Sequence, residues 1–101
     1  MVKIPSIEAD IKMLPEGSFT FTAGSNLKIA TPSNQAVEVR VLDAFSSRKT
    51  HTIEAGDDAF VVFLLVDYPT VSYEGLKAGA RFDIVDGGNV IGGGIVQARV
   101  E

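Results

Sequence analysis

Apolar and polar residues alternate with a period of two along much of the chain. In the stretch 7–13, Ile, Ala, Ile and Met take every second position, with Glu, Asp and Lys between them. The alternation returns at 19–22, at 37–41 and at 96–101. Successive side chains of a β-strand point to opposite faces, so this pattern predicts strands with one buried and one solvated face. No window shows the spacing of an amphipathic helix.

Residues that favour turns separate these segments, with Pro, Gly, Asn and Asp recurring between them. Besides the alternating segments, we expect strands at 27–30, 48–53 and 59–66, and loops or turns at 14–18, 23–25, 31–35, 43–47, 54–58 and 68–79. About seven or eight short strands with turns between them are typical of a sandwich or a barrel. The chain of 101 residues, 46% of them hydrophobic, is long enough for one core. We therefore expect residues 1–101 to form a single all-β domain.

A β-hairpin is predicted near the end of the sequence. Two apolar segments, 81–85 and 90–96, flank the sequence Asp-Gly-Gly-Asn at 86–89. Tight hairpin turns require residues that tolerate positive φ, which Gly and Asn do. Within the second segment, Gly92 and Gly94 lie on the same face of the strand. Glycines inside a strand mark a sharp bend or a place where another segment packs closely, and small barrels need such bends to close.

Several motifs in Glu54–Val96 resemble a known family. They are Ala-Gly-Asp-Asp at 55–58 before an apolar strand, Leu-Lys-Ala-Gly-Ala-Arg-Phe-Asp-Ile at 76–84, and Asp-Gly-Gly-Asn-Val-Ile-Gly-Gly-Gly-Ile-Val at 86–96. In order and spacing they resemble the C-terminal β-barrel of the elongation factor Tu family of translational GTPases. The segment 7–11 is similar to the first strand of that barrel, whereas the middle of the chain does not match. The resemblance implies a small closed or nearly closed antiparallel β-barrel without the GTPase core.

GTP hydrolysis by this chain alone is excluded by its sequence. A phosphate-binding loop requires Gly-x-x-x-x-Gly-Lys-[Ser/Thr] between a strand and a helix. Gly87 and Gly92 have the glycine spacing, but Gly93 stands where the Lys is needed. The segment also has the pattern of a strand, which argues equally against a dinucleotide-binding fingerprint.

The resemblance also points to a turn that contacts tRNA in the family. Asp86 and Gly87 match the acidic residue and the glycine of that turn. Asn89 and Val85 stand where the family has arginines, and the basic, aromatic segment of the tRNA site has no counterpart. The net charge is −4 and the nine basic residues are scattered, whereas nucleic-acid binders usually carry a basic stripe. We therefore expect nucleic-acid binding to be weak or absent.

The segment 59–66 is apolar at every position, which a strand in a single small barrel does not require. One set of side chains fills the barrel and the other needs a cover. In the family strand, the positions of Phe60 and Leu64 are typically polar, which places the even-numbered set outward. Either the chain's own segment 69–77 covers this set, or a partner protein or a second copy does. The candidate interface consists of Phe60, Val62, Leu64, Tyr68 and Tyr73.

The composition offers little for catalysis or for binding metals and cofactors. The chain has no Cys, which excludes disulfides and thiolate zinc sites, and His51 is its only histidine. Asp57 and Asp58 occupy a turn, where aspartates bond to backbone amides. We expect no catalytic residue, no metal site and no cofactor. The N-terminus lacks a signal-peptide pattern and no apolar run is long enough for a membrane helix, so a cytoplasmic location without membrane association is expected.

Three functions remain open from the sequence. The first is a non-catalytic protein-interaction module, a free-standing barrel like a detached translation-factor domain, whose partner is another protein or itself. The second is a translation accessory that associates with tRNA or another RNA. The third is an enzyme of unknown type, which would need a concave polar pocket.

Overall fold

The computed structural model describes residues 4–15, 20–31, 36–46, 52–68, 73 and 75–100. Within this part of the chain the secondary structure is entirely β, with no helix. The strands are β1 (Ser6–Met13), β2 (Thr20–Thr22), β3 (Asn26–Ala30), β4 (Ala36–Ser46), β5 (Thr52–Glu54), β6 (Asp58–Leu64), β7 (Arg81–Asp86) and β8 (Asn89–Val100).

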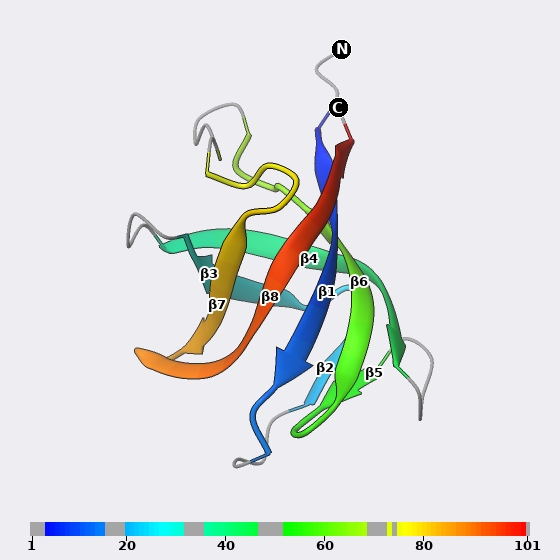
Figure 1. Cartoon of the computed structure of the whole chain (residues 1–101), viewed down its shortest axis with the longest axis vertical. Helices are drawn as coiled ribbons and strands as arrows, with labels where there is room; N and C mark the ends of the chain where they lie inside the picture. Colours follow the sequence, from blue (N-terminus) through cyan, green and yellow to red (C-terminus); the bar gives the residue numbers. More distant parts are fainter. Residues whose placement is uncertain are drawn as a thin grey trace.

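Six of these strands form a closed antiparallel barrel (Figure 1). The order around it is β1-β6-β4-β3-β7-β8, and β8 pairs with β1 to complete the circle. β2 and β5 form a separate two-stranded sheet beside the lower end of β6 in the view of Figure 1. The expected all-β fold with a small closed barrel is therefore confirmed.

Alternation along the strands fills the barrel. β1 buries Ile7, Ala9, Ile11 and Met13, as its sequence pattern predicts. β4 buries its alternate valines and β6 buries Val61 and Phe63 in the same way. The ring of Phe63 meets the ring of Phe82 edge to face, with centroids 6.1 Å apart. Each large apolar side chain removed from water stabilises the fold by about 1.5–3 kcal/mol.

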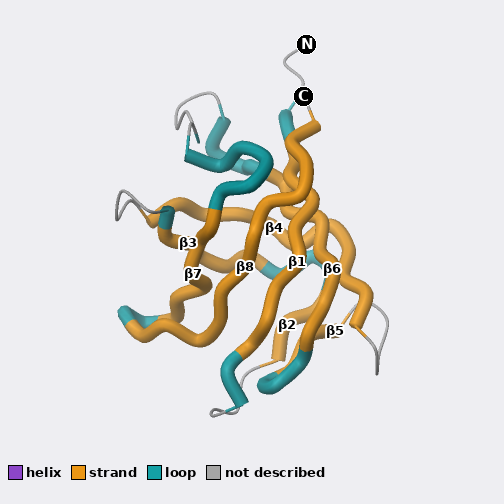
Figure 2. Tube along the Cα trace, in the orientation of Figure 1, coloured by secondary structure: helices purple, strands orange, loops and turns teal. Residues whose placement is uncertain are grey.

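Loops cover the two ends of the barrel (Figure 2). At the end near β2 and β5, the backbone N–H of Met13 donates to the carbonyl of Asp57, and the N–H of Gly56 donates to that of Leu14. At the other end, Leu65, directly after β6, and Leu76, before β7, are fully buried. These contacts hold the open ends of the core away from water.

The predicted hairpin joins β7 and β8. Asp86 pairs with Asn89, so Gly87 and Gly88 are the two central residues of the turn. Both have positive φ, 57° and 86°. Positive φ at both central positions is the geometry of the turn that matches the twist of antiparallel strands, and glycine adopts it without a steric penalty.

Gly92 and Gly94 allow β8 to pass closely over β1. A Cβ on Gly94 would lie 2.6 Å from the carbonyl oxygen of Asp10, 2.7 Å from Cγ2 of Ile11 and 2.8 Å from Cζ of Phe82. A Cβ on Gly92 would lie 2.8 Å from Sδ of Met13. The expected close approach at these glycines is confirmed: Phe82 occupies the space that a side chain at position 94 would take.

The structure corrects one expected loop, and two expected strands lie partly outside the described residues. The segment 43–47 was expected to be a loop, but β4 continues through Ser46. The continuation depends on a β-bulge: Val41 pairs with Phe63 and Asp43 with Val62, which leaves Leu42 as an extra residue. The strand expected at 19–22 is described from Thr20. Of the strand expected at 48–53, residues 48–51 lie outside the described residues.

We predict that Gly94→Ala destabilises the fold by about 3 kcal/mol, because the new methyl group overlaps backbone and core atoms that cannot move independently. Gly75→Ala is the matched control: its Cβ would meet only the Thr31 side chain, at an ordinary 3.4 Å. That change should be neutral or stabilise by up to about 1 kcal/mol. Urea denaturation measures both. Equal midpoints for the two variants would contradict this role of Gly94.

Candidate functional site

A row of outward-pointing residues crosses five strands of the barrel. Phe45 of β4 pairs with Phe60 of β6, which pairs with Asp10 of β1, which in turn pairs with Ile95 of β8. Arg81 of β7 pairs with Ile95 and ends the row. Directly paired residues on antiparallel strands point to the same face, with Cβ atoms about 4.5–5.5 Å apart. The row therefore holds two phenylalanines, one carboxylate, one isoleucine and, at its end, one arginine side by side.

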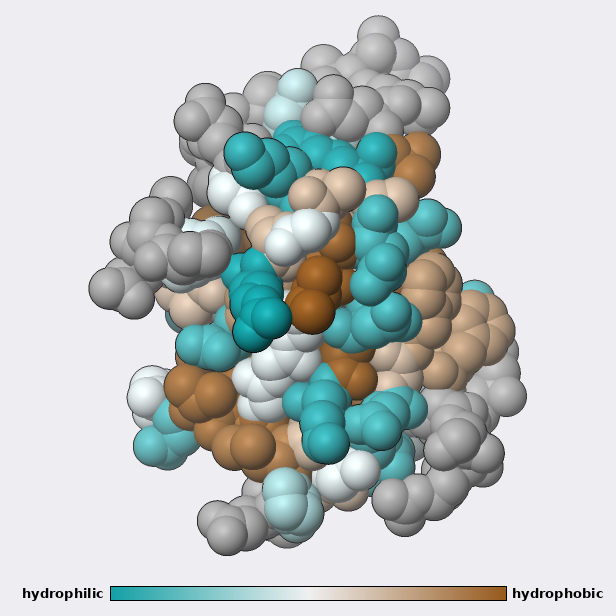
Figure 3. Space-filling view, in the orientation of Figure 1, coloured by the Kyte–Doolittle hydropathy of each residue, from teal (hydrophilic) through white to brown (hydrophobic). Residues whose placement is uncertain are grey.

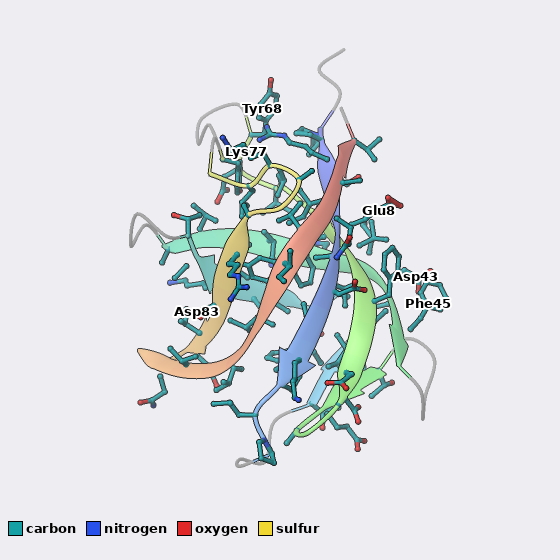
Figure 4. All side chains as sticks on the ribbon, in the orientation of Figure 1. Glu8, Asp43, Phe45, Tyr68, Lys77 and Asp83 are labelled. Carbon is teal, nitrogen blue, oxygen red and sulfur yellow. The ribbon has the colours of Figure 1, made fainter. Side chains whose placement is uncertain are left out.

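These apolar side chains are accessible on the surface. Phe45 is 46% exposed, Ile95 38% and Phe60 36%. Figure 4 shows Phe45 on the right-hand side, where Figure 3 shows an apolar area bordered by hydrophilic residues. Large contiguous apolar areas on a protein surface usually mark an interaction site.

The same residues line an open groove of about 520 Å³. Its floor includes Gly93 and Gly94, where β8 carries no side chains. Lys12 lies in the neighbouring cross-strand row, where it pairs with Asp58 of β6 on one side and with Gly93 of β8 on the other. We call this site the Phe60 groove; it is lined by Asp10, Ile11, Lys12, Phe45, Asp58, Ala59, Phe60, Gly93, Gly94 and Ile95.

The outward set of β6 extends beyond the groove. The strand buries Ala59, Val61 and Phe63, and it turns Phe60, Val62 and Leu64 to the outer surface, as expected. Val62 and Leu64 are half-buried. Val62 pairs with Glu8 and Asp43, and Leu64 pairs with Ser6 and Arg40, so polar neighbours surround them. Phe60 is therefore the most exposed of the three.

Asp10 carries a negative charge between two apolar neighbours. The Gln97 amide donates a hydrogen bond from Nε2 to Oδ2 of Asp10, at 2.9 Å. This bond fixes one side of the carboxylate and leaves the acceptor capacity of its other oxygen facing outward. Glu8 lies on the same face in the next row, paired with Val62 and Ala98. Figure 4 shows Glu8 pointing outward on the same side as Phe45.

Tyr73 does not belong to the surface where the sequence placed it. It is only 3% exposed, so including it in an exposed interface was wrong. Its hydroxyl donates to the carbonyl of Glu38 at 2.8 Å and accepts from the N–H of Asp67 at 3.0 Å. Its own carbonyl accepts from Nη1 of Arg99 at 2.8 Å. Tyr73 therefore ties β4, the segment after β6 and β8 together at one end of the barrel.

Burial also shapes the chemistry of Tyr73. Loss of solvent around the phenol raises the pKa of Tyr73. The hydrogen bond from the N–H of Asp67 lowers this pKa in part, whereas the negative charges of Asp67 and Glu38 raise it further. Its backbone has a φ of 54°, which is uncommon for a residue with a side chain. The hydrogen bonds to three separate segments hold it in this conformation. Tyr68 is half-buried and packs against the core, and Figure 4 shows it at the same end of the molecule.

The turn that resembles the tRNA-contacting turn lies elsewhere. Asp86 and Gly87 are exposed at the tip of the β7–β8 hairpin. They border a second groove of about 290 Å³, which also includes Lys28 and Glu38. One basic and two acidic residues give this groove no excess of positive charge.

The sequence also named Asp57, Asp58 and His51 as residues to consider for chemistry. In residues 4–15, 20–31, 36–46, 52–68, 73 and 75–100, no cluster of three or more His, Asp or Glu has the geometry to hold a metal ion. Asp57 is buried and its Oδ2 accepts from the N–H of Glu54 at 2.9 Å, the turn role its sequence predicts. His51 lies outside the described residues. Within the same described part of the chain, no helical segment has the length and apolarity of a membrane span.

Sequence reasoning found Phe60 but missed its neighbours in the row. The sequence predicts a loop at Phe45 and only strand positions at Ile95 and Asp10. Their assembly depends on register across four strands, which residue patterns do not specify. Alternation places Asp10 and Ile95 outward, but it would turn Phe45 inward, and only the bulge at Leu42 reverses this.

The chain was compared with known protein families and with curated proteins. No family model matches it, and no curated protein is a significant match.

We predict that Tyr73→Phe lowers the free energy of unfolding by about 1–3 kcal/mol, because the carbonyl of Glu38 and the N–H of Asp67 lose a buried partner. The raised pKa gives this contribution a pH dependence. The folded state keeps the phenol protonated where the unfolded chain releases its proton, so the contribution is complete below about pH 10 and declines above it.

Urea denaturation at pH 8 to 11 would measure this difference between Tyr73→Phe and the unmodified chain. Tyr68→Phe is the matched control, since Tyr68 is half-buried. A stability gap between Tyr73→Phe and the unmodified chain that stays constant over this range would contradict the assigned role of the buried hydroxyl.

Proposed function

We propose that this chain is a non-catalytic protein-interaction module that binds a partner at the Phe60 groove. The observation that carries the proposal is the cross-strand row on the outer face of β4, β6, β1 and β8. It places the exposed apolar side chains of Phe45, Phe60 and Ile95 around one groove.

The energetics of such a surface favour binding. Aromatic side chains at the centre of an interface often carry most of its affinity when a partner excludes water from them. Phe60 has this central position, with Phe45 on one side and Asp10 and Ile95 on the other. A polar rim around an apolar centre is the usual arrangement in protein interfaces.

The other two functions have less support. An enzyme needs polar groups that converge in a pocket with a nucleophile, a base or a metal. The Phe60 groove brings together one Lys and two Asp, without His, Ser or Thr among its lining residues. An RNA site needs cations to neutralise phosphates, and this groove has more carboxylates than ammonium groups.

A relation to translation factors is part of the proposal. A closed barrel whose last hairpin is bent at glycines is the architecture that the resemblance of Glu54–Val96 implies. This agreement supports a barrel of the elongation factor Tu type. A shared fold does not carry a shared function, so the proposed role depends on the groove and not on the kinship.

We predict that Phe60→Ser abolishes binding of the partner at the groove. Loss of a central aromatic residue at an interface typically weakens binding by about thirtyfold or more. The measurement is affinity capture from an extract of the native cell, with captured proteins quantified for the unmodified chain and for Phe60→Ser. Val90→Ser is the matched control, because Val90 is an apolar residue that is 50% exposed on β8 and does not line the groove.

Proteins that bind at the groove should disappear with Phe60→Ser and persist with Val90→Ser. Urea denaturation of both variants establishes that each remains folded. Capture that is the same with all three chains would refute the proposed function.

A further inference from the structure

We infer that the partner of the Phe60 groove presents an arginine flanked by apolar side chains, so that its guanidinium binds Asp10 while its neighbours cover Phe60 and Ile95. This inference rests on the proposed function, and it adds the chemistry of the partner. It follows from the position of one carboxylate within an apolar row.

The first argument is the geometry of the row. Asp10 is the direct cross-strand neighbour of Phe60 on one side and of Ile95 on the other. With adjacent strands about 4.8 Å apart, the two apolar side chains stand about 10 Å from each other with the carboxylate between them. A wholly apolar partner that covered both would strip water from the Asp10 carboxylate without replacing it, which is strongly unfavourable. The partner must therefore supply hydrogen-bond donors at this point.

The second argument is the choice of donor. The Gln97 amide holds Oδ2 of Asp10, which fixes the carboxylate in place before a partner arrives. A guanidinium presents several N–H groups in a flat fork that matches a carboxylate, and its face stacks on aromatic rings. The ring of Phe60 lies next to Asp10 to receive such stacking. An ammonium group binds the charge but offers neither the fork nor the flat face.

The third argument is the charge around the groove. Glu8, Asp10 and Asp58 project from the outer face of β1 and β6, and Asp83 of β7 pairs with Gly93. Two cations oppose these four carboxylates: Lys12 in the groove lining and Arg81 beside Ile95. The whole chain has a net charge of −4. A basic partner is attracted by this field, and complementary charge mainly increases the rate and the specificity of association.

The same charges disfavour a second copy of the chain in this groove. A symmetric dimer presents the same patch on both subunits. If it were centred on Phe60, the carboxylates of Asp10, Asp58 and Glu8 from both subunits would be brought into one interface. Like charges brought together at an interface oppose association.

The test uses three short synthetic peptides that share the same alternating leucines and differ in the remaining positions, which are all Arg, all Lys or all Glu. Each is titrated into the ¹⁵N-labelled chain and followed by NMR. The Arg peptide should shift amide signals of β1, β6 and β8 around the groove, and it should bind at least about tenfold more tightly than the Glu peptide. The Lys peptide should be weaker than the Arg peptide by about two- to fivefold.

Asp10→Asn is the decisive variant, because it removes the charge and keeps an oxygen that can accept from Gln97. It should weaken the Arg peptide by about five- to tenfold. Asp86→Asn is the matched control: it removes an exposed carboxylate at the hairpin tip and should leave the affinity unchanged. Raising the ionic strength from about 0.01 M to about 1 M should weaken binding as well, since the screening length falls from about 30 Å to about 3 Å.

Three results would overturn the inference. They are equal binding of the Arg and Glu peptides, signal shifts away from the groove, and an affinity that Asp10→Asn does not change. A solution mass of twice 10.7 kDa that Phe60→Ser reduces to the single-chain value would also overturn it, because a second copy would then be the occupant.

Different results would refute the arginine-bearing partner and the proposed function. If natural partners are lost with Phe60→Ser but persist with Asp10→Asn and at high salt, the interaction module stands and the arginine-bearing partner is refuted. If Phe60→Ser leaves all captured proteins unchanged, the proposed function itself is refuted.

Discussion

The closure of the barrel depends on one close approach, the passage of β8 over β1 at Gly92 and Gly94. Side-chain atoms at either position would overlap the backbone or the side chains of β1. At Gly94 the ring of Phe82 takes the vacant space, and the same ring meets Phe63 on the opposite side of the core. The glycines therefore do more than permit a bend: they allow an aromatic residue to link β7, β8 and β6. β1 pairs with β6 on one side and with β8 on the other, and its pairing with β8 runs through these glycines.

Once the barrel is closed, the strands have a defined inner and outer face. β6 is apolar on both faces, and closure leaves only one of them inside. Of the segment after β6, the described residues Leu65, Tyr73 and Leu76 are buried in the core, and Phe60 remains 36% exposed. The outer apolar side chains of β6 therefore lie on the surface. The carboxylates of Asp10 and Asp58 beside them make this part of the surface both apolar and acidic.

Sequence patterns predicted what depends on local periodicity. The alternation at β1 and β4, the Gly-Gly turn between β7 and β8, and the outward direction of Phe60 all follow from the residues themselves or from their resemblance to a family strand. The remaining features depend on contacts distant in sequence. Tyr73 is buried because its hydroxyl meets a carbonyl 35 positions away, and β4 extends to Ser46 because a bulge at Leu42 keeps its pairing with β6. Residue patterns carry no information about such partners.

The glycine bend that closes the core also creates the groove on the surface. Gly93 lies between the two inward-facing glycines, so it faces outward, in the row of Asp58 and Lys12. Any other residue there would place a side chain beside Lys12 and Ile95, where the groove is now open. Three consecutive glycines therefore serve the inside and the outside at once: two admit Phe82 and β1, and the third leaves space next to Asp10. A partner that binds in this space would contact the same run of three glycines that allows the barrel to close.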